Sequence, residues 1–203
     1  MSDAPATQYA RSADGTNLAY QVTGDGPLDL VFMPGLAIPI DLMWEDPGLL
    51  RMSKRLGSFS RTIWFETRGW GASEGSTVGS TGGAVFGPDL TAVLDAVGAE
   101  RVALVGSSTG GENAIQFSVS HPERVSALVL LDTYAHYVRD EDYPWGVPAQ
   151  VLDRFVASVK ELLGTGANVD VLAPSRMADD RFRQWYARCE RLGGGPDQLG
   201  EAV

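Results

Sequence analysis

The chain has 203 residues, of which 44% are hydrophobic and 21% are charged, and its formal net charge is −10. These values are typical of one folded globular domain and exclude a disordered chain. The acidic balance argues against nucleic acid as a partner, because phosphate backbones are repelled. Cys189 is the single cysteine, which excludes an internal disulfide and a cysteine-only metal site.

No apolar stretch reaches the roughly 18 residues of a membrane span. The first thirty residues also contain no continuous apolar segment of the kind found in signal peptides. We therefore expect a cytoplasmic protein without a membrane partner.

The first half of the chain alternates short apolar runs with turn signals. Residues 16–22 alternate weakly between apolar and polar, and buried strands are predicted over residues 28–33 and 61–65. A helix is predicted over residues 43–56, with Pro47 at its start or at a kink. Residues 66–87 are rich in Gly, Ser and Thr, which indicates mostly loop.

The pattern then becomes regular. A helix is predicted over residues 88–97, with Pro88 in its first turn and Gly98 just after its end. A strand over 101–105, a helix over 110–120 and a strand over 126–131 follow. Strands and helices that alternate with short connections predict a parallel α/β sheet.

The character of the sequence changes after Leu131. Residues 134–148 are aromatic, charged and rich in proline, and two amphipathic helical patterns follow them. We therefore divide the chain into an α/β core, residues 1–133, and a partial helical cap, residues 134–203.

The clearest chemical signal is the sequence Gly-Ser-Ser-Thr-Gly at residues 106–110, a Gly-x-Ser-x-Gly pattern. It follows a predicted buried strand and opens a predicted helix, as a nucleophile elbow requires. The sharp turn lifts the central hydroxyl, that of Ser108, above the sheet edge. At a helix N-terminus, developing negative charge is favoured.

With this elbow the sequence resembles the α/β-hydrolase superfamily over residues 9–192. Residues 33–36, Met-Pro-Gly-Leu, resemble the oxyanion loop of the family. Residues 66–73, Glu-Thr-Arg-Gly-Trp-Gly-Ala-Ser, resemble its Asp-x-Arg-Gly-x-Gly-x-Ser loop, with Glu in place of Asp. Residues 142–146, Asp-Tyr-Pro-Trp-Gly, are similar to α/β-hydrolase domains fused to nucleotide cyclase or other signalling domains in actinobacteria.

The resemblance implies a hydrolase of carboxylic esters, lactones or related acyl bonds that forms a covalent acyl-serine on Ser108. It implies that the backbone N–H groups of Leu36 and Thr109 form the oxyanion hole. No metal or organic cofactor is implied. The substrate pocket is expected between the elbow edge of the sheet and residues 134–192.

The acid and the histidine of the family triad usually follow strands that come after the cap. The sequence is therefore expected to lack the last strands of the fold and to be weakly active or inactive alone. Of its two histidines, His121 is interpreted as a helix terminator. For Asp132 and His136 two interpretations are open: a loop carboxylate and a polar residue that faces the cap, or the acid and the base that serve Ser108.

A competing hypothesis is a ligand-sensing or regulatory domain that binds a small molecule without catalysis. Both hypotheses predict a small-molecule partner, either an acyl substrate or an apolar ligand. Strand 126–131 would lack its usual neighbour, so self-association through its exposed edge is also expected.

Overall fold

The structure is a computed structural model, and it describes residues 4–35, 38–76 and 82–195. In these residues six strands form one sheet with the order β1-β2-β4-β3-β5-β6. The strands are β1 (Gln8–Arg11), β2 (Asn17–Thr23), β3 (Leu28–Met33), β4 (Ser60–Phe65), β5 (Val102–Ser107) and β6 (Val125–Leu131). Strands β3 to β6 pair in parallel, whereas β1 and β2 pair antiparallel.

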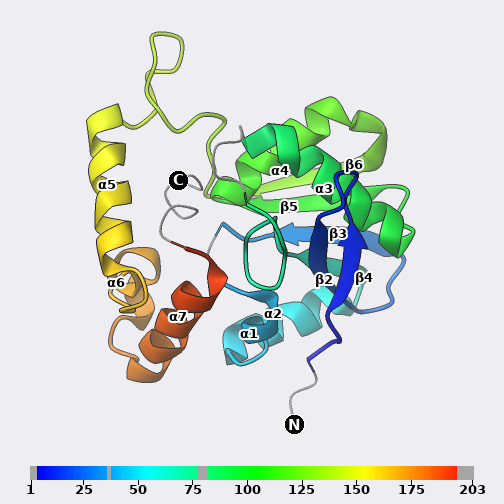
Figure 1. Cartoon of the computed structure of the whole chain (residues 1–203), viewed down its shortest axis with the longest axis horizontal. Coiled ribbons are helices and arrows are strands. Elements are labelled where there is room, and N and C mark those ends of the chain that lie inside the picture. Colours follow the sequence, from blue (N-terminus) through cyan, green and yellow to red (C-terminus); the bar gives the residue numbers. More distant parts are fainter. Residues whose placement is uncertain (1–3, 36–37, 77–81, 196–203) are drawn as a thin grey trace.

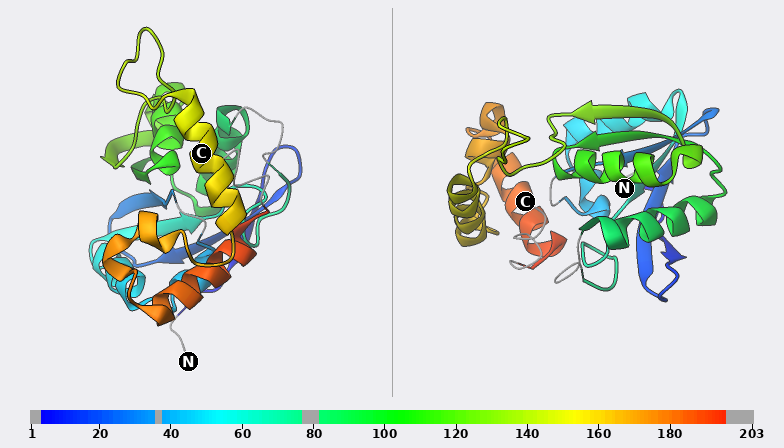
Figure 2. Two further views of the ribbon diagram at one scale, coloured as in Figure 1. Left: turned by 90° about the vertical axis from the view of Figure 1, so that its left-hand side faces the viewer. Right: turned by 90° about the horizontal axis from the view of Figure 1, so that it is seen from above.

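Helices cover both faces of the sheet (Figures 1 and 2). One face carries α1 (Ile40–Met43) and α2 (Pro47–Gly57), and the other carries α3 (Gly82–Val97) and α4 (Thr109–Ser120). The alternation of side chains along each strand supplies both cores. Ile63 of β4 is buried with α3 and α4, and its neighbour Trp64 is buried with α1. The predicted α/β-hydrolase fold class, with a mostly parallel sheet and helices on both faces, is confirmed.

Two helices, α1 and α2, lie in the region where the sequence predicts one helix over residues 43–56. Pro47 is the first residue of α2, and the Asp46 side chain caps that helix by accepting from the N–H groups of Gly48 and Leu49. Proline suits this position because the first N–H of a helix has no partner inside it. The interruption therefore lies at the start of α2 and not within it.

Helix α3 begins at Gly82, six residues before the predicted start, and Pro88 lies inside it. The prediction that Pro88 opens this helix was therefore wrong. The ring of Phe86 is buried against the ring of Phe65, with centroids 5.8 Å apart. Burial of this aromatic ring favours a helical first turn despite the hydrogen bond that proline removes.

The region after β6 is helical. It contains α5 (Ala149–Leu162), α6 (Val169–Leu172) and α7 (Asp180–Gly193), together with a 3₁₀ turn at Pro174–Arg176. A second 3₁₀ turn, Pro122–Arg124, precedes β6. Apart from isolated bridges, no strand follows β6 in the described part of the chain. We call α5, α6 and α7 the helical cap, and they lie together beside one end of the sheet (Figure 1).

Three contacts attach the last cap helix to the core. Trp185 Nε1 donates a hydrogen bond to the carbonyl of Leu42 over 3.0 Å. The N–H of Gly71 donates to the carbonyl of Gly193 over 2.6 Å. Arg188 also forms an ion pair with Glu45. Helix α7 therefore packs beside the loop that resembles the family Asp-x-Arg-Gly segment.

Candidate active site

The register of the parallel strands brings three loops to one edge of the sheet. Met33 at the end of β3 pairs with Gly106 of β5, and Ser107 pairs with Leu131 at the end of β6. Parallel strands place their carboxyl ends on the same side, which is where ligands bind in such sheets. The loops after β3, β5 and β6 therefore meet around Ser108.

Ser108 has a backbone conformation that residues other than glycine rarely adopt, with φ 52° and ψ −127°. It joins β5 to α4, and its N–H donates to the carbonyl of Leu131 over 3.1 Å. Such strain costs of the order of 1–3 kcal/mol and persists where the surrounding structure enforces it. The Gly-x-Ser-x-Gly turn thus has the strained geometry of a nucleophile elbow.

Close backbone packing around this turn explains its glycines. A Cβ on Gly35 would lie 2.3 Å from the Cβ of Ser108, and a Cβ on Gly106 would lie 2.5 Å from the Cα of Gly111. Neither contact can be relieved by a side-chain movement. Gly35 therefore lets the loop after β3 pass directly against the candidate nucleophile.

The structure describes only one of the two N–H groups that are predicted to form the oxyanion hole. Thr109 is the first residue of α4, where the backbone N–H has no acceptor within the helix. Leu36 lies outside the described residues. The oxyanion hole formed by Leu36 and Thr109 therefore stays a prediction.

A tyrosine that the sequence did not single out contacts the candidate nucleophile. The hydroxyl of Tyr137 lies 3.1 Å from Ser108 Oγ, at hydrogen-bond distance. Tyr137 follows β6 by six residues, within a segment predicted only as cap. Burial raises the pKa of Tyr137 above that of a free phenol, so the hydroxyl stays protonated.

The two histidines lie in different places. His121 ends α4 and stacks on Phe117, with ring centroids 4.5 Å apart. Since the 12 residues of α4 extend about 18 Å, His121 is far from Ser108 at the other end. The interpretation of His121 as a helix terminator agrees with this position.

His136 is exposed, and its ring contacts the ring of Tyr143 at 6.1 Å. Asp132 is exposed too, with a positive φ of 45°. In the part of the chain that the structure describes, no hydrogen bond joins Asp132 to His136 or His136 to Ser108. Hydrogen bonds at active sites are often absent without substrate, so the Ser108–Asp132–His136 set stays a prediction.

A cavity of about 410 Å³ lies at this edge of the sheet. Gly35, Thr109 and Tyr137 line it from the loops around the elbow, while Leu152 of α5 and Gly193 of α7 line it from the helical cap. A cavity thus lies where the substrate pocket is predicted, between the elbow edge and residues 134–192; that it binds the substrate stays a prediction. Ser108 is not itself among the lining residues, whereas its hydrogen-bond partner Tyr137 is.

Glu66 is a buried carboxylate in the cavity lining. Its two oxygens accept hydrogen bonds from the N–H groups of Ile40, over 2.8 Å, and Ala72, over 2.6 Å. Burial raises its pKa to about 7 because the desolvation cost outweighs these hydrogen bonds. Glu66 therefore connects α1 with the loop at residues 66–73.

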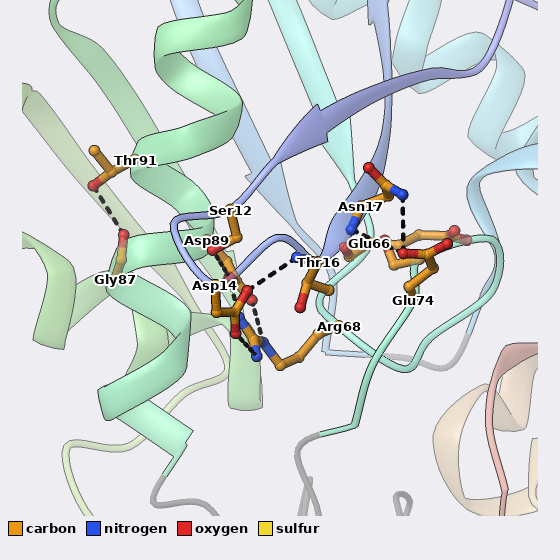
Figure 3. A network of polar contacts seen from close by, with 11 residues as sticks. Ser12, Asp14, Thr16, Asn17, Glu66, Arg68, Glu74, Gly87, Asp89 and Thr91 are labelled. Atoms are coloured by element: carbon orange, nitrogen blue, oxygen red, sulfur yellow. Dashed lines mark hydrogen bonds and ion pairs between the residues drawn. The ribbon is translucent and has the colours of Figure 1, made fainter.

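Arg68, also in the lining, is held by two carboxylates (Figure 3). Its Nε and Nη2 donate to Asp89 over 2.8 and 2.6 Å, and its Nη1 donates to Asp14 over 2.8 Å. Asp89 also accepts from the hydroxyl of Ser12. The guanidinium lowers the pKa of Asp14 well below its usual range. The charge of Arg68 is thus already compensated by protein groups.

The described ranges contain no group of three or more His, Cys, Asp or Glu side chains arranged to hold a metal ion. Within those ranges, no helix is both long enough and apolar enough to cross a membrane.

The fold and the strained elbow agree with the comparison against known families. A profile described as the alpha/beta hydrolase fold matches residues 58–190, which include β4, the elbow and most of the helical cap. The chain belongs to the α/β-hydrolase family. Members of this family share a fold and differ widely in reaction, so the reaction must be argued from the site.

Two kinds of curated relative are similar to this α/β-hydrolase. A 2-hydroxy-6-oxononadienedioate/2-hydroxy-6-oxononatrienedioate hydrolase from Paraburkholderia phymatum is 31% identical over 137 residues, 64% of this chain and 46% of that protein. A pimeloyl-(acyl-carrier protein) methyl ester esterase from Nitrosomonas europaea is 31% identical over 139 residues, 68% of this chain and 50% of that protein. The chain thus spans about half the length of these relatives.

Solved structures show the same fold. An esterase from Exiguobacterium antarcticum superimposes with a TM-score of 0.77 at 19% identity, covering 97% of this chain and 72% of that one. The esterase RhEst1 from Rhodococcus gives a TM-score of 0.72 at 24% identity, covering 95% of this chain and 70% of that one.

Proposed function

We propose that this α/β-hydrolase is a serine-dependent acyl hydrolase in which Ser108 forms the acyl-enzyme. The observation that carries the proposal is the strained backbone of Ser108 at the start of α4, with Gly35 packed against it. A protein keeps such strain where a function requires it. The hydrolases and esterases among the relatives support the same reaction class.

We further propose an uncharged carboxylic ester as the substrate. In the described lining of the cavity, Arg68 is the one lysine or arginine, and Asp89 and Asp14 already neutralise it. Glu66 and Glu112 add carboxyl groups to the same lining. A second carboxylate on the substrate would meet no unpaired lysine or arginine in this lining, only the exposed imidazole of His136, and it would face the carboxyl groups of Asp89 and Glu112. This favours a neutral ester over a dicarboxylate.

Labelling of the purified chain with a fluorophosphonate, followed by peptide mapping, tests the reaction class. We expect modification at Ser108 and its loss in Ser108→Ala, whereas Ser107→Ala serves as the matched control and keeps the labelling. Modification at Ser73 or Ser107 that survives Ser108→Ala would overturn the assignment.

Competition with this labelling tests the substrate class. A neutral butyrate ester is expected to slow the modification of Ser108, and the singly charged hemisuccinate ester of the same alcohol is expected to slow it much less. Equal protection by the two esters would contradict the proposed preference.

A second candidate function is ligand sensing without turnover. The hydrogen bond of Ser108 to Tyr137, rather than to an imidazole, favours it, and so does the similarity of residues 142–146 to signalling-fusion domains. A sensor would bind the ester analogue with unchanged affinity after Ser108→Ala and would not be labelled.

A further inference from the structure

Among the described residues, Tyr137 places its hydroxyl at hydrogen-bond distance from Ser108 Oγ, the oxygen on which the proposed chemistry depends. Tyr137 Oη lies 3.1 Å from Ser108 Oγ, although the two residues are 29 positions apart in the sequence. Tyr137 is half-buried and lines the cavity, whereas Ser108 does not. A ligand in the cavity would therefore meet the phenol hydroxyl beside the serine oxygen.

The segment that carries Tyr137 is fastened to the elbow at several points. The carbonyl of Leu131 accepts from the N–H of Ser108, and the hydroxyl of Thr133 donates to the carbonyl of Ser108 over 2.6 Å. The carbonyl of Tyr137 accepts from the N–H of Val147 over 2.8 Å. The phenol is thus positioned from both sides and needs no rearrangement to reach Ser108.

Burial and a neighbouring carboxylate keep the Tyr137 hydroxyl protonated, so it is able to donate a hydrogen bond. Desolvation is the main cause that raises the pKa of Tyr137, and the nearby carboxylate of Glu112 raises it further. A neutral phenol carries one proton to donate. When the Tyr137 hydroxyl donates to Ser108 Oγ, the serine does not use its own proton in that hydrogen bond. The serine proton can then pass to a base.

We propose that Tyr137 is a catalytic residue whose hydroxyl donates a hydrogen bond to Ser108 Oγ and stabilises the negative charge that develops there. The inference rests on the proposed function. A bond between neutral hydroxyls is weak, and it strengthens as the acceptor becomes charged. Because the gain appears mainly in the transition state, this contact accelerates the reaction more than it strengthens substrate binding.

The rate of phosphonylation by a fluorophosphonate probe tests this role. In that step Ser108 Oγ bonds to phosphorus, fluoride leaves with the electron pair of the broken bond, and the serine proton passes to solvent base. The variant Tyr137→Phe removes the hydroxyl and keeps the ring that packs 5.3 Å from Tyr134. We expect it to slow labelling about 10- to 100-fold, the effect of one hydrogen bond to a charged oxygen.

The matched control is Tyr134→Phe, which removes a hydroxyl from the exposed neighbouring ring. Its labelling rate should stay within about twofold of wild type, since no described contact joins that hydroxyl to Ser108. Melting temperatures measured alongside separate a loss of fold from a loss of reactivity. The pH dependence adds a second readout: the labelling rate of Tyr137→Phe should level off at a higher pH than the rate of wild type, because loss of the donor disfavours the serine alkoxide.

The outcomes separate the two proposals. Labelling of wild type at Ser108 with an equal rate in Tyr137→Phe overturns the role of Tyr137 and leaves the proposed function intact. An equal slowing in Tyr134→Phe also overturns it, because loss of a hydroxyl that does not contact Ser108 would then have the same effect. Absence of labelling in folded wild-type protein overturns the proposed function and, with it, this inference.

Discussion

Ser108 concentrates backbone strain and the candidate chemistry in one residue. Its φ of 52° lies in a region that glycine adopts freely and other residues adopt only at an energetic cost. Neighbouring contacts hold it there: the N–H of Ser108 bonds to the carbonyl of Leu131, and the backbone of Gly35 packs against the Ser108 side chain. The elbow therefore lowers stability while it holds the partly buried Ser108 hydroxyl beside Tyr137, which lines the cavity.

Comparing two substitutions at Ser108 measures this strain. Ser108→Gly and Ser108→Ala both lose the hydroxyl, but only glycine adopts the backbone conformation without cost. We expect Ser108→Gly to be more stable than Ser108→Ala by about 1–2 kcal/mol in urea unfolding. At Ser107, which has no positive φ, glycine should instead be less stable than alanine by about 0.5–1 kcal/mol. The same order of stability at both positions would contradict the strain.

Glu66 predicts how stability depends on pH. Its pKa is about 7 in the folded protein, against a usual value of 4.5, because burial disfavours the charged form. The folded state therefore holds the proton more tightly than the unfolded state. This contribution is fully present below pH 4.5 and is lost as the pH rises through 7, by an order of 3 kcal/mol.

The variant Glu66→Gln isolates this contribution. Its amide turns an NH₂ toward one of the two backbone N–H donors, so the variant should be less stable at acidic pH. We expect the difference in unfolding free energy between wild type and Glu66→Gln to shrink between pH 4.5 and pH 7. Urea unfolding at several pH values measures it, and a constant difference would show that Glu66 does not titrate there.

At the scale of elements, one ion-pair network holds the loop after β4 against α3. Asp89 of α3 is 1% exposed and binds Arg68 through two hydrogen bonds, while Asp14 in the turn between β1 and β2 has a side chain 52% exposed. The same guanidinium thus bonds to one buried and one solvated carboxylate (Figure 3).

The two carboxylates should differ greatly in their effect on stability. Asp89→Asn leaves Arg68 without its buried counter-charge and should lower the unfolding free energy by about 3–5 kcal/mol. Asp14→Asn, the matched control, should lower it far less, because water screens an exposed pair. Urea unfolding at pH 7 measures both, and equal losses would mean that burial does not decide the strength of the pair.

At the scale of the whole molecule, β6 is one of the two edge strands of the described sheet, opposite β1. Its residues Leu128, Val129, Leu130 and Leu131 are between 38% and 45% exposed. Because successive side chains point to opposite faces, this run leaves both faces of the strand partly uncovered. An apolar edge strand with unpaired backbone groups recruits other chains.

We therefore predict that the 203-residue chain self-associates through β6. Size-exclusion chromatography with light scattering should give a mass above that of one chain. Leu130→Lys should shift the population toward the monomer, because an edge lysine opposes strand pairing. The control Val119→Lys alters a side chain that is 78% exposed on α4 and should change nothing. A wild-type monomer at all concentrations would refute the prediction.

The sequence alone determined the features that depend on local order. Apolar runs and turn residues predicted β3, β5, α4 and β6 to within one or two residues, and the Gly-x-Ser-x-Gly pattern identified the elbow. These signals lie within short stretches of chain, where strand alternation, proline and glycine act directly on the backbone. The four residues of β1 carry one buried side chain, Ala10, so that strand had too little pattern to be found.

Only the tertiary structure decided which groups meet at the elbow. The buried contact of Phe86 with Phe65 extended α3 past Pro88, and the pairing of β5 with β6 brought Tyr137 to Ser108. Neither contact has a signal in local sequence, because each joins residues more than twenty positions apart. The burial of Glu66 and the ion pairs of Arg68 with Asp14 and Asp89 likewise depend on tertiary packing. Residue type supplies the reactive groups, and burial and long-range contact decide which of them meet and so which chemistry this site supports.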